Sequence, residues 1–333
     1  ACSVMFLLTA CNKDKEIMNS LAEYNTTMES DGYHFGDAIK LPKEVTDNAE
    51  SVTISFGDKE TSNLVVDPKF FTLGDNAVTF NIKTNKGESL QQDATINVFA
   101  KNQEAKLTYN VVKEYPHDTA NFTEGFFLEG NTVYESVGLE GQSKLVRYNL
   151  GSTNVLTEAK QPDDIFSEGI TALNGKIYQL TYRAKKGFIY DKNTFKLLGE
   201  FPYPNVIGEG WGMTTDGKSL IVSDGTKNIY FLDPNDPSKL LRYISVAGHS
   251  EAFDQVNELE YHNKFIYANV WQKPLILKIN PANGEVVATM DLAELAAKNT
   301  KGNDDVLNGI AFKGDNMLVT GKNWPTIYEI AIK

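Results

Sequence analysis

Acidic, amide and aromatic residues recur at equivalent places in five repeated segments of the chain. The segments start at Glu124, Glu168, Trp211, Asn257 and Asn308, at spacings of 44, 43, 46 and 51 residues. Fourteen residues after three of these starts stand Tyr182, Trp271 and Lys322. Taken singly, each has a structural explanation, such as a hydrogen bond to buried backbone groups. Taken together, carboxylates, carboxamides, a lysine and aromatic rings favour a ligand pocket.

The repeat also predicts the fold that would bring these residues together. Each segment continues through a turn with Gly or Asn into an apolar run such as Val133-Tyr134, and then into a further strand such as Phe188–Asp191. Units of about 40–50 residues with four strands are the blades of β-propellers. We therefore expect an all-β protein with a five-bladed β-propeller over residues 104–333. The repeat starts would then form a ring at one mouth of its channel.

The fifth repeat has only three strand patterns, because the printed sequence ends at Lys333, directly after Thr326–Ile330. The apolar stretch Lys106–Val112 precedes the first repeat and could supply the missing strand. This pairing would close the ring and leave no open edge between the first and last blades.

The first residues differ in character from everything that follows. Val4–Ala10 is a short apolar run that leads into Cys11. Such a run resembles the end of a secretory signal before the lipid-modified cysteine of a bacterial lipoprotein. Residues 1–11 are therefore interpreted as a signal remnant, with Cys11 as a lipid anchor. This would place the protein in the bacterial cell envelope, on the periplasmic or outer-membrane face, with the lipid as its only contact to the membrane.

A second, smaller domain is expected before the repeats. Residues 12–30 are polar and are interpreted as a tether. Between residues 31 and 103, alternating runs such as Ser51–Phe56 and Ala94–Phe99 are typical of antiparallel strands with one buried face. The sequence therefore predicts a small Ig-like β-sandwich in front of the propeller.

Composition excludes several classes of partner and cofactor. The net charge of −12 argues against nucleic acid, which needs a basic surface. Four His and two Cys argue against a zinc site and against a disulfide framework. We therefore expect no cofactor and no catalytic metal, although a structural ion in the channel is compatible with the sequence. The protein is expected to be a monomer.

The motifs around the repeat starts resemble the plant-type glutaminyl-peptide cyclotransferases (glutamine cyclotransferases). They are Tyr115–Asp118, Phe122–Gly125, Tyr134–Leu139, Phe166–Gly169, Gly208–Gly212, Val256–Leu259, Leu307–Ile310 and Thr320–Pro325. The resemblance runs from about residue 112 to the end of the sequence. Members of this family are five-bladed propellers, in agreement with the number of repeats.

The resemblance implies an enzyme that converts the N-terminal Gln of peptides or proteins into pyroglutamate and releases ammonia. Glu168 corresponds to the family's proton-transferring glutamate. The substrate-binding residues are then expected to be Phe122, Glu124, Phe166, Tyr182, Trp211, Asn257, Trp271, Asn308, Lys322 and Trp324. The family usually has Gln in place of Glu124 and Trp in place of Tyr182, so this chain adds a charge and reduces one aromatic wall.

This cyclisation requires a group, such as a carboxylate, that takes a proton from the substrate amine and returns it to the departing nitrogen. Because an α-ammonium group has a pKa of roughly 8, an ordinary glutamate is a weak base for it. A partly desolvated site that raises the pKa of Glu168 would help. Lys322 and the Asn257 amide are the expected donors to the tetrahedral oxyanion.

Two other functions remain open on the sequence. A non-catalytic propeller lipoprotein that binds peptide or glycan would keep the aromatic residues but would not need Glu168. A propeller hydrolase or lactonase would instead hold a metal such as Ca²⁺ in the channel, through oxygen atoms of Glu124, Glu168, Asn257 and Asn308.

Overall fold

The structure, a computed structural model, describes residues 12–24 and 32–333, which fall into two compact units. The first unit contains the residues up to Gln103 together with Ala247–Ala252, and the second contains Glu104–Val246 and Phe253–Lys333. Cys11 and the rest of the interpreted signal remnant lie outside the described residues, as does the part of the interpreted tether from 25 to 30. Within the described ranges, no helix is both long and apolar enough to cross a membrane.

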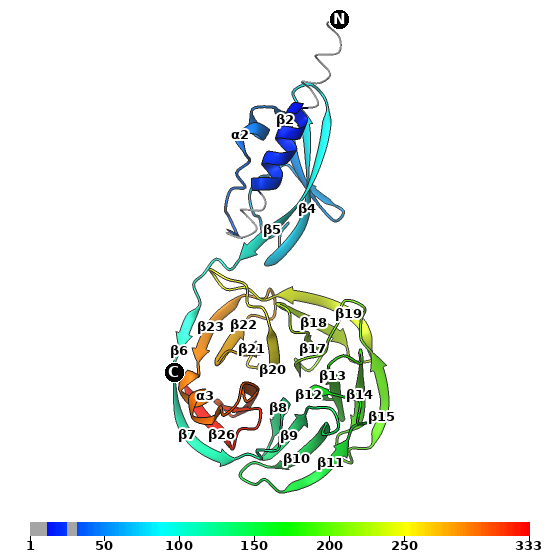
Figure 1. Ribbon diagram of the computed structural model, residues 1–333, viewed down its shortest axis with the longest axis vertical. Coiled ribbons are helices and arrows are strands. Elements are labelled where there is room, and N and C mark those ends of the chain that lie inside the picture. Colours follow the sequence, from blue (N-terminus) through cyan, green and yellow to red (C-terminus); the bar gives the residue numbers. More distant parts are fainter. Residues whose placement is uncertain (1–11, 25–31) are drawn as a thin grey trace, which may run out of the picture. The chain divides into compact units, whose positions relative to one another are not determined.

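Five sheets form a ring in the second unit (Figure 1). The first has β8 (Thr123–Glu129), β9 (Thr132–Val137), β10 (Lys144–Asn149) and β11 (Val155–Lys160). The second has β12 (Ser167–Leu173), β13 (Lys176–Thr181), β14 (Lys186–Asp191) and β15 (Leu197–Pro202). The third has β16 (Met213–Thr215), β17 (Leu220–Ser223), β18 (Asn228–Asp233) and β19 (Asp236–Ser245).

The last two sheets also take strands from the segment that precedes the first repeat. The fourth has β20 (Val256–His262), β21 (Phe265–Val270), β22 (Leu275–Ile279), β23 (Val286–Asp291) and, at its edge, β6 (Ala105–Leu107). The fifth has β24 (Leu307–Lys313), β25 (Asn316–Gly321), β26 (Thr326–Ile332) and β7 (Tyr109–Pro116). A helix that the sequence analysis did not predict, α3 (Ala293–Asn299), lies between β23 and β24.

Apolar side chains fill the space between each pair of neighbouring sheets. Phe127 and Ile170 belong to the cluster between the first and second sheets, and Ala311 shares a cluster with Phe126 between the fifth and first. The clusters between the second and third, third and fourth, and fourth and fifth sheets complete the circle. Burial of these side chains against both neighbours stabilises the ring, so the residues of β8 and β12 are nearly all buried while those of β11 and β15 are mostly exposed.

The ring is closed by pairing between the start and the end of the second unit. β7 pairs antiparallel with β26, from Pro116 opposite Thr326 to Tyr109 opposite Ile332. The prediction that a segment before the first repeat completes the fifth sheet is therefore confirmed. Its predicted limits, 106–112, were wrong, because β6 leaves this segment to pair in parallel with β23 of the fourth sheet.

Among its described residues, the first unit has one sheet rather than the two sheets of the expected Ig-like sandwich. Its strand order is β1 (Tyr33–His34), β5 (Ser89–Phe99), β4 (Gly74–Thr84), β2 (Ala49–Phe56) and β3 (Lys59–Thr61). A helix over residues 12–24 and the short α2 (Lys43–Thr46) accompany this sheet.

The interpretation of residues 12–24 as a tether was wrong. Ile17 and Leu21 of this helix are buried in the same apolar cluster as Phe80 and Val98 of the sheet. The two residues stand four apart and so share one face of the helix. This apolar face packs with the side chains of the sheet where the sequence analysis expected a second sheet.

Candidate active site

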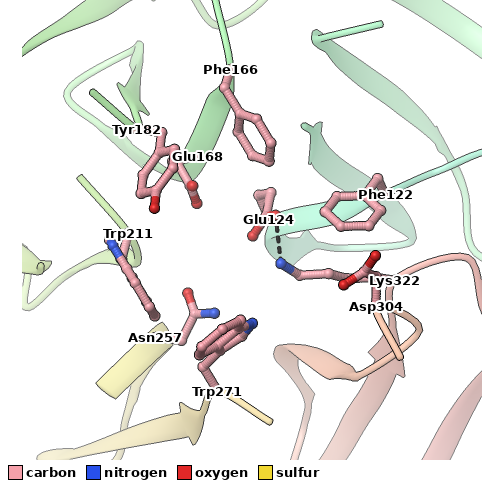
Figure 2. A pocket seen from close by; sticks show the side chains of 10 residues that line it. All are labelled: Phe122, Glu124, Phe166, Glu168, Tyr182, Trp211, Asn257, Trp271, Asp304 and Lys322. Atoms are coloured by element: carbon pink, nitrogen blue, oxygen red, sulfur yellow. Dashed lines mark hydrogen bonds and ion pairs between the residues drawn. The ribbon is translucent and has the colours of Figure 1, made fainter. Parts of the chain in front are cut away.

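A pocket of about 230 Å³ lies where the first residues of the inner strands converge. Figure 2 shows the side chains that line it, which are Phe122, Glu124, Phe166, Glu168, Tyr182, Trp211, Asn257, Trp271, Asp304 and Lys322. The structure thus brings together nine of the eleven residues predicted for the site. Drug-sized ligands usually occupy roughly 300–1,000 Å³, so this volume suits a single amino-acid residue better than a longer segment of peptide.

Irregular pairing at the start of four inner strands changes the direction in which the side chains of the site residues point. The register between the first two strands of a sheet shifts at Glu124, at Glu168, at Asn257 and at Asn308. Such β-bulges bend a strand and redirect a side chain, and they are frequent next to active sites. In the third sheet Trp211 precedes the strand itself, and its carbonyl oxygen accepts a hydrogen bond from the Gly169 amide at 2.7 Å.

Glycine after the site residue allows the inner strands to approach one another closely. A Cβ atom on Gly125 would lie 2.6 Å from the backbone nitrogen of Ile170, and one on Gly212 would lie 2.0 Å from the carbonyl oxygen of Asn257. The fourth sheet has Glu258 at this place. Its carboxylate accepts a hydrogen bond from the Ile310 amide at 2.8 Å and so joins the fourth and fifth inner strands.

Glu124 is held by two residues of the fifth sheet. Lys322 Nζ lies 2.6 Å from Glu124 Oε1, and both side chains are almost fully buried. The Asn308 amide donates to Glu124 Oε2 at 3.3 Å and to the Thr123 carbonyl oxygen at 2.9 Å. The lysine nitrogen also lies 4.6 Å from the centre of the Phe122 ring, within cation–π range. Burial raises the pKa of Glu124, and the Lys322 ammonium opposes this rise.

Glu168 has a different electrostatic environment from Glu124. Burial raises the pKa of Glu168 well above its ordinary value. The negative charge of Glu124 raises this pKa further, as does a hydrogen bond between the two carboxyl groups, while Lys322 lowers it. The two carboxyl groups therefore titrate as a coupled pair, in which Glu168 binds a proton more readily and Glu124, beside the lysine, keeps its charge more readily.

Aromatic rings form two walls of the pocket. On one side Phe166 makes an edge contact with Phe122 at 6.2 Å between ring centres and a tilted contact with Tyr182 at 5.6 Å. On the other side Trp211 and Trp271 meet edge to face at 5.9 Å. In Figure 2 the Asn257 amide lies between these two tryptophans. The arrangement places an amide and two acids among apolar surfaces.

Neighbouring groups fix the Trp211 ring. Its indole N–H donates to Glu209 Oε2 at 3.0 Å. Gly225 has a φ of +80°, and a Cβ at this position would lie 2.4 Å from the ring. Glu209 also accepts a hydrogen bond from Arg183 Nε at 3.2 Å, and this guanidinium group stacks on Tyr182 at 4.5 Å. The orientations of Trp211 and Tyr182, one ring from each wall, are thereby set before any ligand binds.

Two residues predicted to bind substrate do not line the pocket. Asn308 lies behind Glu124 and orients this carboxylate, as described above. Trp324 is fully buried, and its indole N–H donates to the Asp305 carbonyl oxygen at 2.9 Å. The prediction for Trp324 was wrong because its ring packs on Gly321, where a Cβ would lie 2.3 Å away. Trp324 instead connects the end of β25 to the loop before β24.

Asp304 lines the pocket although the sequence analysis did not identify it. It lies in the loop between α3 and β24. Its surroundings, Gly302 to Asp305, have the composition of an ordinary polar turn. The available signal was the repeat spacing of 51 residues, the longest of the four, which indicates an insertion between Asn257 and Asn308.

The position of Lys322 argues against the metal-dependent alternative. The ammonium of Lys322 already takes the position beside Glu124 that a cation would need, at 2.6 Å. A second positive charge at this place would be repelled at short range.

A coupled pair of buried carboxyl groups, a buried lysine and a free amide define a pocket for acid–base chemistry on a small polar substrate. Comparisons with known proteins agree with this class. A glutaminyl-peptide cyclotransferase of Arabidopsis thaliana is 37% identical over 230 residues, which are 67% of this chain and 71% of that protein. The crystal structure of Myxococcus xanthus glutaminyl cyclase matches with a TM-score of 0.64 and 29% identity, over 69% of this chain and 99% of that one.

The family model for glutamine cyclotransferase matches residues 82–332. The chain belongs to the glutamine cyclotransferase family, and the resemblance drawn from the motifs is confirmed. The match begins in β4 of the first unit and covers all five sheets of the second.

Proposed function

We propose that this chain is an acyltransferase that closes the N-terminal Gln of peptides and proteins into pyroglutamate and releases ammonia. The α-nitrogen of the substrate attacks the carbon of its own side-chain amide, so that one C–N bond forms and another breaks. The observation that carries the proposal is the Glu168 carboxyl group, buried beside the Glu124–Lys322 pair in a pocket with aromatic walls.

Glu168 is the proton carrier in this proposal. It takes one proton from the attacking α-nitrogen and gives it to the departing nitrogen, which leaves as ammonia, so the enzyme ends in its starting state. An α-ammonium group has a pKa of roughly 8. Burial raises the pKa of Glu168 and so brings it closer to the pKa of the amine. A closer match of the two pKa values favours proton transfer in both directions.

Lys322 and Asn257 are placed to stabilise the tetrahedral intermediate. Lys322 Nζ has three N–H bonds and gives one of them to Glu124. The Asn257 side chain is buried and lines the pocket (Figure 2). Within residues 12–24 and 32–333 its oxygen has no hydrogen-bond partner, and its amide nitrogen donates to no other side chain or backbone group. The amide nitrogen can therefore donate to the oxyanion, while the oxygen can accept a hydrogen bond from the substrate. Donors fixed in place before the reaction need no reorganisation as charge develops.

The aromatic walls have a role in orientation. The side chain of Gln must fold back so that its amide carbon meets its own α-nitrogen. Rings on two sides of a small pocket restrict the aliphatic carbons of the substrate to such a folded shape. Holding two reacting groups of one molecule together in this way removes much of the entropic barrier.

A direct assay tests the proposal. A Gln-led peptide is incubated with the protein, and the loss of ammonia from the peptide is followed by mass spectrometry. The matched control is the same peptide with an acetylated α-nitrogen, which cannot attack. We expect loss of ammonia from the free peptide alone. Binding of the free peptide without loss of ammonia would instead support the non-catalytic binding protein.

We also propose that the ring of five sheets is a five-bladed β-propeller that β7 closes. The five apolar clusters between successive sheets support this architecture. Removal of the chain through Glu114, which takes most of β7, should accelerate thermal loss of activity far more than removal through Gln103, which leaves β6 and β7 in place. Equal rates of inactivation for the two shortened chains would contradict closure by β7.

We propose further that Cys11 carries a lipid and holds the protein on the bacterial cell envelope, on its periplasmic or outer-membrane face. The support is the apolar run Val4–Ala10 that leads into this cysteine. When the chain is produced in a bacterium with its signal, it should partition into detergent, and a Cys11→Ser variant should not. Equal partition of the two proteins would remove the lipid anchor from the proposal.

A further inference from the structure

Asp304 is the exposed residue of the pocket. The other nine lining side chains are buried or half-buried, and the three charged ones among them, Glu124, Glu168 and Lys322, are buried. The Asp304 carboxylate has no hydrogen bond or ion pair to any residue in the ranges 12–24 and 32–333. Its charge is therefore both accessible to solvent and available to a ligand at the mouth of the pocket.

The loop that carries Asp304 is firmly held. The carboxylate of Asp305 accepts hydrogen bonds from the backbone amides of Lys301 at 3.1 Å and Gly302 at 2.9 Å. The carbonyl oxygen of Asp305 accepts one from the indole of Trp324 at 2.9 Å. The position of Asp304 is thus set by its neighbour, and a charge in a fixed position can discriminate between ligands at a lower entropic cost.

The reaction determines which part of a peptide meets this carboxylate. Both reacting atoms belong to the first residue, so the terminal Gln must occupy the buried part of the pocket near Glu168. The rest of the peptide is expected to leave through the mouth, because a cavity of about 230 Å³ is small for a longer segment of peptide. An extended chain advances by about 3.3–3.6 Å per residue, which places the second and third side chains at the rim.

Neighbouring positive charges do not neutralise Asp304. Lys322 lines the pocket, but its ammonium group is engaged by Glu124 at 2.6 Å. Lys273 lines a separate hollow on the side of Gly302 and Asn303, and Lys301 lines neither hollow. On the opposite wall of the pocket, Arg183 is paired with Glu209 at 3.2 Å. The uncompensated charge at the mouth is therefore negative.

We infer that Asp304 determines specificity: it favours substrates with Lys or Arg directly after the terminal Gln and disfavours substrates with Glu or Asp there. This inference rests on the proposed cyclisation of N-terminal Gln. The ligand class is a Gln-led peptide with a basic second residue, and recognition is an exposed ion pair at the rim. Such a contact forms equally in the ground state and in the transition state, so it changes KM more than kcat.

Peptides that differ only in the second residue test the inference. The value of kcat/KM is measured for peptides that begin Gln-Lys, Gln-Ala and Gln-Glu, at low and at physiological ionic strength. For the parent protein we expect Gln-Lys to exceed Gln-Ala by about two- to five-fold at low ionic strength, as for other exposed ion pairs, and Gln-Glu to be the poorest. The preference should shrink as salt is added.

Variants then assign the preference to one side chain. Asp304→Asn should bring the three peptides close together, and Asp304→Lys should place Gln-Glu above Gln-Lys. Asp315→Asn is the matched control, because Asp315 is an exposed acid in the turn at the far end of β24, and this variant should keep the parent's preference.

The outcomes separate the inference from the proposed function. If the parent protein turns over Gln-Ala but shows no preference, or if Asp304→Asn keeps the preference, the inference is overturned and the cyclisation stands. If no Gln-led peptide loses ammonia, the cyclisation fails and the inference fails with it.

Discussion

The starts of the first and second inner strands carry the same residue in the same local structure, and yet they differ in charge. Glu124 and Glu168 both lie at a β-bulge, and each is followed by Gly. Glu124 meets the Lys322 ammonium and the Asn308 amide, which stabilise its ionised form. Glu168 meets Glu124 itself, whose negative charge favours a proton on Glu168. The neighbours in the ring, rather than the strand, therefore decide which glutamate is more easily protonated.

The asymmetry comes from the fifth sheet. Asn308 lies in β24 of this sheet and Lys322 directly follows its β25, and both contact the first sheet, which is its neighbour in the closed ring. The second sheet borders the third, which presents Trp211 at the equivalent place. A ring of similar sheets can therefore hold one charged carboxylate and one more easily protonated carboxyl group on adjacent inner strands, provided that the neighbouring sheets differ.

The largest effect is expected at Glu168. Glu168→Gln keeps the size and polarity of the side chain but cannot carry a proton between the two nitrogens. Because general acid–base catalysis contributes about 10²–10⁴-fold, kcat for a Gln-led peptide should fall by this order while peptide binding changes little. Rates of ammonia release and a binding titration measure the two quantities. Near-normal turnover of this variant would place the proton carrier elsewhere.

Removal of the cation beside Glu124 should mainly affect stability. Lys322→Met leaves a buried carboxylate without its partner, which typically lowers the free energy of unfolding by about 3–5 kcal/mol. The double variant Lys322→Met, Glu124→Gln should recover most of this loss, because no buried charge is left unpaired. Denaturant unfolding of the parent, both single variants and the double variant gives the coupling energy. If the effects of the two single replacements on the free energy of unfolding simply add in the double variant, the Lys322–Glu124 pair at 2.6 Å has no coupling energy.

Glu124→Gln alone should change the pH dependence of the reaction. Burial is the main cause of the raised pKa of Glu168, and the charge of Glu124 is the second. Without this charge the pKa of Glu168 falls, so Glu168 can accept a proton at lower pH. The acid limb of kcat/KM should therefore move to lower pH, while the rate on the high-pH side stays close to that of the parent or rises. A limb that stays in place would show that the two carboxyl groups are not coupled.

The smallest effect is expected at Glu258, a buried glutamate that does not line the pocket and has no role in the proposed reaction. Burial raises the pKa of Glu258 well above its ordinary value. The folded state therefore keeps a proton at pH values where the unfolded state, with a glutamate pKa of about 4.3, has lost it. The stability of the parent must then fall as the pH rises above this value.

Replacement of Glu258 by Gln removes this dependence. The melting temperature of Glu258→Gln should rise relative to that of the parent as the pH increases from 5 to 8. The variant should keep the enzymatic activity of the parent. Thermal scans across this pH range measure the difference. A constant difference between the two proteins would mean that Glu258 titrates as an ordinary glutamate.

The printed sequence determined the parts of this protein that depend on local pattern. The five inner strands start within two residues of the predicted repeat starts, because alternation of apolar residues and the turns between them are encoded within each segment. Seven pocket residues are repeat starts or stand fourteen residues after one, since equivalent positions in a ring lie on the same face, and the family resemblance added Phe122 and Phe166. The helix over 12–24 was missed because its two core residues, Ile17 and Leu21, are too few to form a periodic pattern.

The tertiary structure alone decided the contacts that give these residues their properties. Lys322 and Glu124 are 198 positions apart in the chain, and only the closed ring brings them to 2.6 Å. Trp324 is an aromatic residue of the kind that lines pockets, but its ring packs on Gly321 and hydrogen-bonds to the loop before β24. The same loop carries Asp304 to the mouth of the pocket. Charge, burial and orientation depend on which neighbours surround a side chain, and a repeat pattern specifies a position in the ring without specifying those neighbours.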